Sequence, residues 1–416
     1  MNFPIFIARR LGFKTADSRT SSPGVVVGYI GVALAIVIML LAIAVVNGFK
    51  KEIKNKLVGF NSEITLLADS KEEAPGQTSG IRLTDSLRNV ITKSAPDAEM
   101  ALIIRQPAIF KTDSDFQGII LKGLPDSTGW GFYAENLTAG RIPEKSDGSN
   151  AVVISTTTAS QLGIKAGDKL LTHFFDGNSI RSRNLLVTGI YDTHFHDFDA
   201  SFAFTPLSML QHLCHVDSLT GTAIELRGIG IDNAATTGRE IQESMVMETI
   251  SNPDNPMLCH VSTIDETCSQ YLNWLDLLDT NVTVIILLMA CVASFTLISS
   301  LFILILERVN TVGLLKALGA TNRQIRYIFI YMAQRLVIRG MIIGNVIALA
   351  FVWLQYSYRV IPLDADAYYL NYVPVSLSWH AVAIVDIAVI VISALVLILP
   401  SHIIATLSPS TTLRYE

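Results

Sequence analysis

Two short segments of the chain each contain two histidines at a spacing that could bind a metal ion. Residues 193–199 read THFHDFD, which places His194 and His196 two positions apart, and residues 212–215 read HLCH. Residues two apart share one face of a strand and residues three apart share one face of a helix, so each segment could offer two ligands to zinc. A complete site would need the two pairs to meet in space. Solvated or packed histidines are the simpler interpretation, and we predict no metal site.

Sequence motifs for nucleotide hydrolysis and for common hydrolytic chemistry are missing. The sequence contains no GxxxxGK[ST] loop, no HExxH, no GxSxG and no CxxC. The first absence excludes an ATP site of the P-loop type, because that loop supplies the amides that hold the phosphates. If ATP drives this chain, another protein must hydrolyse it.

The strongest local signal is the segment 307–325, which reads ERVNTVGLLKALGATNRQI. Gly319 is a plausible residue to end a short helix, and Thr321 can cap the helix that follows. The residues predicted to form one apolar face of the short helix are Val312, Leu314, Leu315 and Leu318. A short amphipathic helix of this kind lies on lipid or docks on a soluble partner.

The elements that must position these segments follow from the composition. The chain has 416 residues, of which 50% are hydrophobic and 16% are charged, and its mean hydropathy is +0.44. These values exclude a disordered chain and are atypical of a soluble one, while a net charge of −5 argues against a nucleic-acid partner. A bilayer core needs about 20 apolar residues per helix. Transmembrane helices are predicted at 24–46, 282–306, 327–356 and 380–400.

The distribution of Lys and Arg in the short loops predicts the orientation. Residues 307–339 hold six of these cations, whereas residues 357–380 hold only Arg359. Because basic loops stay in the cytoplasm, the 307–326 loop is expected inside. The remaining parts are then a cytoplasmic arm (1–23), an external domain (47–281), a short external loop (357–379) and a cytoplasmic tail (401–416).

The external domain is predicted to be an acidic α+β domain with mixed sheets. It holds 19 Lys and Arg against 30 Asp and Glu, a net charge of −11. Strands are expected at 63–68, 100–110, 118–122, 151–154, 169–175, 184–191 and 222–226, and helices at 83–94, 156–162, 207–213 and 232–247. Cys214, Cys259 and Cys268 would lie outside, where one disulfide of open pairing could form.

Two features connect this domain with the predicted spans. No Gly or Pro interrupts residues 262–306, so a helix is expected to run unbroken from the external domain into the second span. The first span is likewise expected to continue outward past Phe49. Asp386 lies within the fourth span, where a carboxylate is a candidate for a pathway or gate. The alternatives are that Asp386 faces water or pairs with a neighbouring helix.

The 307–321 segment resembles the coupling segment of FtsX-type ABC permeases, which have one span, a large periplasmic domain and three further spans. Other segments resemble more narrowly the LolC/LolE family of lipoprotein-releasing permease subunits. They are FIARR (6–10), NGFKKEI (47–53), ILKGLPDS (120–127), GRIPEKSDGSNAVVIS (140–155), QLGIKAGDKL (161–170), VTGIYDTHFHDFDASFAFTPL (187–207), IPLDADAYYLNYVPV (361–375) and the closing LSPSTTLRYE. The resemblance runs nearly end to end.

The resemblance implies a non-catalytic permease subunit in the bacterial inner membrane, with its large MacB-like core domain in the periplasm. It would bind no cofactor itself, and ATP and Mg²⁺ would be used by a LolD-like ABC ATPase. Its other partners would be a second copy or a paralogous permease, a lipoprotein substrate, a LolA-like periplasmic carrier and the lipid bilayer. The residues expected to couple to the ATPase are Glu307, Arg308, Gly313, Leu314, Leu315, Lys316, Ala317, Leu318, Gly319 and Ala320.

The resemblance also implies where the substrate and the carrier would touch the chain. A substrate path is expected near Asn47, Phe49 and Asp386. A carrier contact would use Phe174, Phe175, Asp176 and Gly177, although this stretch is short, lacks prolines and also reads as a plain hairpin turn. The alternatives are a related permease that acts on a periplasmic hydrolase or an efflux partner, and a zinc-dependent periplasmic protein.

Overall fold

The computed structural model describes residues 6–7, 23–68, 80–126, 129–144, 150–176, 179–253, 257 and 259–398. The chain divides into two compact units. One, which we call the helical unit, comprises Met1–Lys51, Leu275–Pro362 and Val373–Glu416. The other, which we call the α+β unit, comprises Glu52–Trp274 and Leu363–Tyr372.

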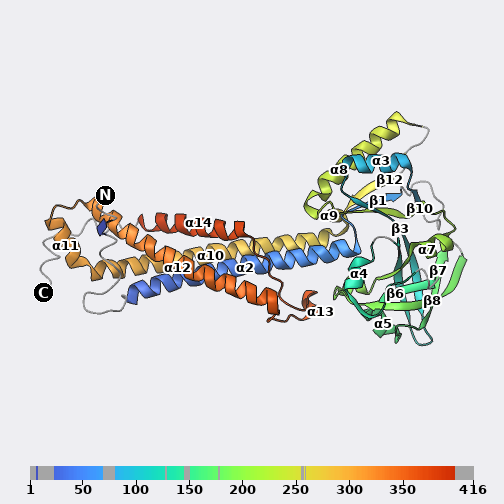
Figure 1. The fold of residues 1–416 in the computed structure, drawn as a ribbon, viewed down its shortest axis with the longest axis horizontal. Helices are drawn as coiled ribbons and strands as arrows, with labels where there is room; N and C mark the ends of the chain where they lie inside the picture. Colours follow the sequence, from blue (N-terminus) through green and yellow to red (C-terminus); the bar gives the residue numbers. More distant parts are fainter. Residues whose placement is uncertain are drawn as a thin grey trace. The chain divides into compact units, whose positions relative to one another are not determined.

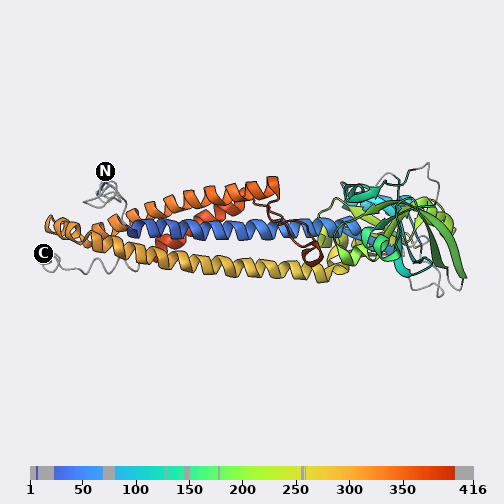
Figure 2. The ribbon, with the colours of Figure 1, turned by 90° about the horizontal axis from the view of Figure 1, so that it is seen from below.

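The helical unit is built from long apolar helices that run side by side in both views (Figures 1 and 2). They are α2 (Pro23–Phe60), α10 (Ser269–Glu307), α12 (Asn322–Tyr358) and α14 (Trp379–Val396), with the short α11 (Val309–Ala317) between α10 and α12. The four long helices are long and apolar enough to cross a membrane. As predicted, α2 continues well past the first charge-free stretch, to Phe60.

The helix predicted to run unbroken from residue 262 begins later, at Ser269. Residues Cys259–Thr263 instead form strand β12, which pairs with β1. A single turn, α9 (Ile264–Thr267), follows and is fixed by a capping box between Thr263 and Glu266. Apolar spacing alone could not show this break, because the hydrogen bonds that hold β12 come from a strand far away in the sequence.

Small residues let the long helices approach closely. A Cβ at Gly340 of α12 would lie 2.8 Å from the carbonyl oxygen of Tyr29 in α2. On another side of α2, Gly28 packs against Ser300 of α10, whose hydroxyl donates to the carbonyl of Gly24 at 2.7 Å. Glycines and hydroxyl side chains at such contacts are typical of packed membrane helices.

The α+β unit contains a mixed sheet of ten strands. Their order is β12-β1-β11-β3-β4-β9-β6-β8-β5, and β7 pairs with both β3 and β8. Its strands are β1 (Ile64–Ala68), β3 (Glu99–Lys111), β4 (Phe116–Leu124), β5 (Leu137–Gly140), β6 (Ala151–Ser155), β7 (Lys169–Asp176), β8 (Ser179–Tyr191), β9 (Phe202–Pro206), β11 (Ala223–Arg227) and β12. β2 (Ile81–Arg82) and β10 (Thr220–Gly221) form a separate pair.

The α+β unit also contains helices outside the sheet. They are α3 (Asp85–Ser94), α4 (Gly131–Glu135), α5 (Thr156–Leu162), α6 (His196–Asp199), α7 (Leu207–Cys214), α8 (Ile231–Ser251), α9 and α13 (Ala365–Tyr368). The core holds an aromatic cluster around Phe60, the last residue of α2. Phe60 stacks on Phe198 with ring centroids 5.0 Å apart, and Tyr133 lies 3.8 Å from Phe204.

Candidate functional site

The predicted coupling segment folds into the short helix α11, which lies at one end of the helical unit (Figure 1). Its last turn closes where the amide of Leu318 donates to the carbonyl of Leu314 at 3.0 Å. Gly319 follows with φ of +90°, a conformation that side chains disfavour and that commonly ends a helix. Thr321 then caps α12 in a reciprocal box with Gln324, as predicted for its hydroxyl.

The apolar side chains of α11 divide between two sides of the helix, rather than forming the single face that we predicted. Val312 is 2% exposed and packs in the core of the helical unit, whereas Leu314 and Leu318 are 59% and 76% exposed. Positions 312 and 314 lie about 200° apart around a helix, so they cannot share one side. The exposed pair, Leu314 and Leu318, is four residues apart and forms a small apolar surface.

The other predicted coupling residues surround this pair. Glu307, Ala317 and Gly319 are exposed, Gly313 is buried, and Arg308, Leu315, Lys316 and Ala320 are half-buried. Their coupling role stays a prediction.

Asp386 pairs with a neighbouring helix, which was one of the alternatives for it. The side-chain amide of Asn345 in α12 donates to Asp386 Oδ2 in α14 at 2.8 Å. A second polar contact joins the same helices, because the Ser393 hydroxyl donates to Gln334 Oε1 at 3.3 Å. Asp386 therefore contributes to the packing of α12 on α14.

The other two predicted path residues lie at the end of the first predicted span. Asn47 is exposed, whereas Phe49 is buried. Between them, a Cβ at Gly48 would lie 2.6 Å from the carbonyl carbon of Pro374. Only a glycine permits this close approach of two chain segments. A substrate path through these residues stays a prediction.

The predicted carrier contact falls on the β7–β8 hairpin. Phe174 is 1% exposed and belongs to the core, whereas Phe175 is 43% exposed. Asp176 ends β7, but its side chain and Gly177 lie outside the described residues. A partner at this hairpin would therefore meet Phe175 and not Phe174.

An exposed apolar sheet face adjoins Phe175, and we did not predict it. The strand register aligns Phe116 of β4 with Leu171 of β7 across Lys111, and Phe175 with Ile180 of β8. The exposed fractions of these hydrophobic residues are 69% for Phe116, 36% for Leu171, 43% for Phe175 and 65% for Ile180. The adjacent pair Phe174 and Phe175 was the sequence feature that could have predicted this face. Neighbouring residues of a strand face opposite sides of the sheet, so two adjacent phenylalanines make both sides apolar.

Of the four histidines in the 193–199 and 212–215 segments, His194 and His196 make side-chain hydrogen bonds, whereas His212 and His215 are exposed. His194 Nδ1 lies 3.1 Å from Asp192 Oδ1, and His194 Nε2 lies 2.6 Å from Asn371 Nδ2. His215 ends α7 with φ of +54°. Among the described residues, no three His, Cys, Asp or Glu side chains are placed to hold a metal ion. All four cysteines are free thiols, and burial raises the pKa of Cys259 to about 11.

A buried charge cluster lies at the C-terminal end of α2. Lys122 is fully buried on β4, and its ammonium donates to Glu225 Oε1 at 2.6 Å and to the carbonyl of Phe60 at 2.7 Å. Arg105 and Arg227 contact the same carboxylate at 2.8 and 3.2 Å. A cation is favourable at a helix C-terminus, where carbonyl groups lack partners within the helix. The cluster therefore anchors the end of α2 in the sheet.

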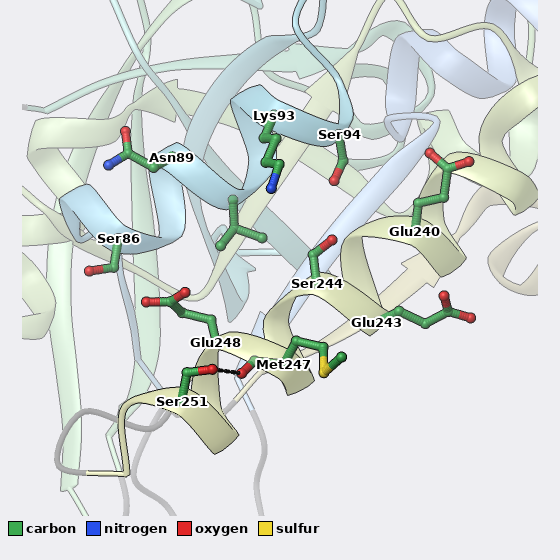
Figure 3. A pocket seen from close by; sticks show the side chains of 11 residues that line it. Ser86, Asn89, Lys93, Ser94, Glu240, Glu243, Ser244, Met247, Glu248 and Ser251 are labelled. Atoms are coloured by element: carbon green, nitrogen blue, oxygen red, sulfur yellow. Dashed lines mark hydrogen bonds between the residues drawn. The ribbon is translucent and has the colours of Figure 1, made fainter.

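A groove of about 790 Å³ lies between α3 and α8 (Figure 3). Three carboxylates from α8 line it, those of Glu240, Glu243 and Glu248, and Lys93 of α3 lies opposite. Four serines, Asn89, Val90 and Met247 complete its wall. Glu240 and Glu243 are exposed to solvent. The groove offers hydrated charges but no buried acid or base that could be prepared for catalysis.

Comparisons with known proteins match two successive parts of the chain to two domain families. Residues 10–241 match the MacB-like periplasmic core domain, and residues 283–409 match the FtsX-like permease C-terminal. The chain is 21% identical over 427 residues to the lipoprotein-releasing system transmembrane protein LolC of Xylella fastidiosa, covering 98% of this chain and 96% of that protein. It is also 21% identical over 432 residues to LolE of Haemophilus influenzae, covering 99% of both.

A solved structure, the periplasmic region of MacB from Actinobacillus actinomycetemcomitans, is 13% identical and covers 54% of this chain and 98% of its own, with a TM-score of 0.34. The two matched domains together span most of the chain, and the resemblance to LolC and LolE that we drew from short motifs is confirmed over nearly its full length. The chain belongs to the family of permeases that carry a MacB-like periplasmic core domain before an FtsX-like permease C-terminal domain.

Proposed function

We propose that the chain is the permease subunit of an ABC complex that releases lipoproteins from the outer leaflet of the bacterial inner membrane. The observation that carries this proposal is the similarity to LolC and LolE over nearly the full length, with both domains in the same order. A lipoprotein would leave the membrane through a cavity formed with a second copy or a paralogue, and pass to a periplasmic carrier.

In this proposal α2, α10, α12 and α14 span the inner membrane. The α+β unit, inserted between the first and second spans, is periplasmic, and α11 and both chain ends are cytoplasmic. The count of Lys and Arg in the short loops and the family description of the core domain support this orientation.

The energy for release would come from a separate ATPase that binds ATP and Mg²⁺, so the chain itself would be non-catalytic. Each buried CH₂ group of a lipid anchor holds it in the bilayer by about 0.8 kcal/mol, so unassisted release of several acyl chains is very slow. The exposed Leu314 and Leu318 on α11 offer an apolar contact for that ATPase. Movement at α11 would then reach the α+β unit through the continuous helices α2 and α10.

The test is purification of the full chain with its native partners and reconstitution into liposomes that carry a lipoprotein. The expected result is a co-purifying ATPase and ATP-dependent transfer of the lipoprotein to a soluble carrier. A stable complex without an ATPase would contradict the proposal. A bound periplasmic hydrolase or efflux adaptor, without lipoprotein release, would favour the related permease function.

The β7–β8 hairpin gives a prediction for carrier contact. Replacing both Phe175 and Ile180 by serine is expected to weaken carrier binding at least about tenfold, because exposed apolar anchors dominate such contacts. The measurement is binding of the purified carrier to the reconstituted complex. The matched control replaces Val246 and Met247 of α8, which are 49% and 68% exposed, by serine. Equal binding by the two double variants would show that the hairpin is not the carrier site.

A further inference from the structure

The segment Leu363–Tyr372 connects α12 to α14, yet it belongs to the α+β unit and not to the helical unit. It forms a closed loop, because the amide of Leu363 donates to the carbonyl of Asn371 at 3.0 Å. Tyr369 adopts φ of +61° within it. A non-glycine residue in this conformation needs surrounding contacts that hold it there.

Those contacts come from the segment 192–199 of the α+β unit. Asn371 Nδ2 lies 2.6 Å from His194 Nε2, and the ring of Tyr369 meets the ring of Phe195 edge to face at 4.7 Å. His194 also has a positive φ, of +58°, and its amide donates to Asp192 Oδ1 at 2.9 Å. Two strained turns therefore hold each other through side chains.

Lys56 joins the two turns. Its ammonium donates to the carbonyl of Thr193 and to the carbonyl of Tyr369, each at 2.5 Å. The Thr193 carbonyl is held in place because the Thr193 hydroxyl and amide donate to Asp199 at 2.8 and 3.2 Å. Lys56 itself lies one turn before the end of α2 at Phe60.

The base of the loop is fixed to α12 in a separate place. Gln355, in the last turn of α12, is 2% exposed. Its side-chain amide donates to the carbonyl of Val373 at 2.8 Å, and its oxygen accepts from the amide of Ile361 at 3.1 Å. The chain segments on either side of the loop are therefore both hydrogen-bonded to Gln355 of α12.

We propose that Lys56 is a positioning residue that holds the 363–372 loop against the 192–199 segment of the α+β unit, an arrangement that we call the clasp. The clasp is a third connection, beside α2 and α10, through which movement of α12 and α14 reaches that unit. The inference rests on the proposed function, in which an ATPase at α11 moves α12. Because Gln355 fixes the base of the loop and Lys56 fixes its tip, a displacement of α12 pulls on the 192–199 segment. Without the ammonium, the loop could move relative to the 192–199 segment, and part of the displacement of α12 would not reach that segment.

The test compares Lys56→Met with Lys56→Arg and with the control Lys51→Met, an exposed lysine on the same helix. In the reconstituted complex, Lys56→Met is expected to lower the lipoprotein released per ATP hydrolysed about fivefold while ATP hydrolysis itself continues, and Lys56→Arg is expected to restore part of it. Amides at 369–372 should exchange with deuterium faster in Lys56→Met than in Lys51→Met. Asn371→Leu, which opens the clasp from the loop side, should act in the same direction.

An unchanged release ratio in both Lys56→Met and Asn371→Leu, or unchanged amide exchange at 369–372, would overturn the inference. Loss of release and of ATP hydrolysis in equal proportion would do the same, because it would indicate a folding defect and not a loss of transmission. If the unaltered complex hydrolyses ATP but releases no lipoprotein, the proposed function fails instead. In that case the exchange measurement still tests the clasp.

Discussion

A chain that carries Leu314→Glu together with Leu318→Glu is expected to lose its ATPase partner. Both side chains are exposed on one side of α11, while the opposite side is buried against the helical unit. Two carboxylates at the centre of an apolar contact would have to be desolvated, and anchors of this kind each contribute at least about tenfold to binding. The measurement is the amount of ATPase that co-purifies with the membrane-inserted chain, for which a fall of at least about a hundredfold is expected.

The control for this variant is Leu219→Glu, which adds one charge at a leucine that is 45% exposed in the α+β unit. It should retain the ATPase, as should Val312→Ala, which shortens a buried side chain without changing the exposed surface. Lys316→Glu tests the charge of the same helix, and reduced coupling of ATP hydrolysis to release is expected. Full retention of the ATPase by the double leucine variant would rule out this surface as the contact.

Local patterns predicted much of the α+β unit because their causes are local. The expected strand at 151–154 and helix at 156–162 correspond to β6 and α5, where the Ser155 hydroxyl caps the amide of Thr158 at 3.1 Å. Strand β9 was not predicted, although it pairs with β4 and β6 inside the sheet. Its partners lie far along the chain, and neither the position of a strand in a sheet nor its parallel pairing with β4 is encoded in the strand's own residues.

The candidate site shows the same limit. The turn after α11 was predictable, because Gly319 and Thr321 act on their immediate neighbours. Which side of α11 is buried depends on its packing in the helical unit, so the predicted face grouped the buried Val312 with Leu314 and Leu318, which are exposed on the other side. The sequence could not show that His194 contacts Asn371, because that partner lies 177 residues further on.

The charge cluster at the end of α2 carries the second large prediction. Lys122 is fully buried on strand β4, and the carbonyl end of α2 covers it. Replacing Glu225 by Gln would remove the carboxylate, 0% exposed, that Lys122, Arg105 and Arg227 share. Removing one partner of a buried ion pair destabilises a protein by about 3–5 kcal/mol. The midpoint of thermal unfolding of the full chain in detergent should therefore fall by roughly 10 °C.

A matched surface pair provides the control. Arg141 and Glu144 lie 3.6 Å apart with side chains that are 50% and 65% exposed. Exposed pairs contribute about 0–1 kcal/mol, so Glu144→Gln should leave the unfolding midpoint almost unchanged. The double variant Lys122→Met with Glu225→Gln should be more stable than the sum of the single losses predicts, because the two residues act as one pair. Equal effects of Glu225→Gln and Glu144→Gln would contradict this account.

The same cluster predicts how stability changes with acidity. Burial disfavours the charged form of Glu225, but Lys122, Arg105 and Arg227 together outweigh burial and lower the pKa of its carboxyl group to about 2. A carboxyl group with a lowered pKa stabilises the folded state fully above its unfolded pKa of about 4.3, and this contribution is lost as the pH falls toward the folded value. Asp199 acts in the opposite direction, because burial raises its pKa to about 6 despite the donors of Thr193 and Phe195.

The difference in unfolding midpoint between the unaltered chain and Glu225→Gln separates the two carboxyl groups, because Asp199 is present in both proteins. This difference should be largest between about pH 5 and pH 7, because burial lowers the pKa of Lys122 to about 7 and its ammonium loses its charge above that pH. It should shrink as the pH falls toward about 2, where Glu225 itself becomes neutral. Titration of Asp199 near pH 6 should leave the difference unchanged. A difference that stayed constant down to pH 2, or that grew as the pH fell, would show that the carboxylate of Glu225 does not hold the three cations and, through Lys122, the end of α2.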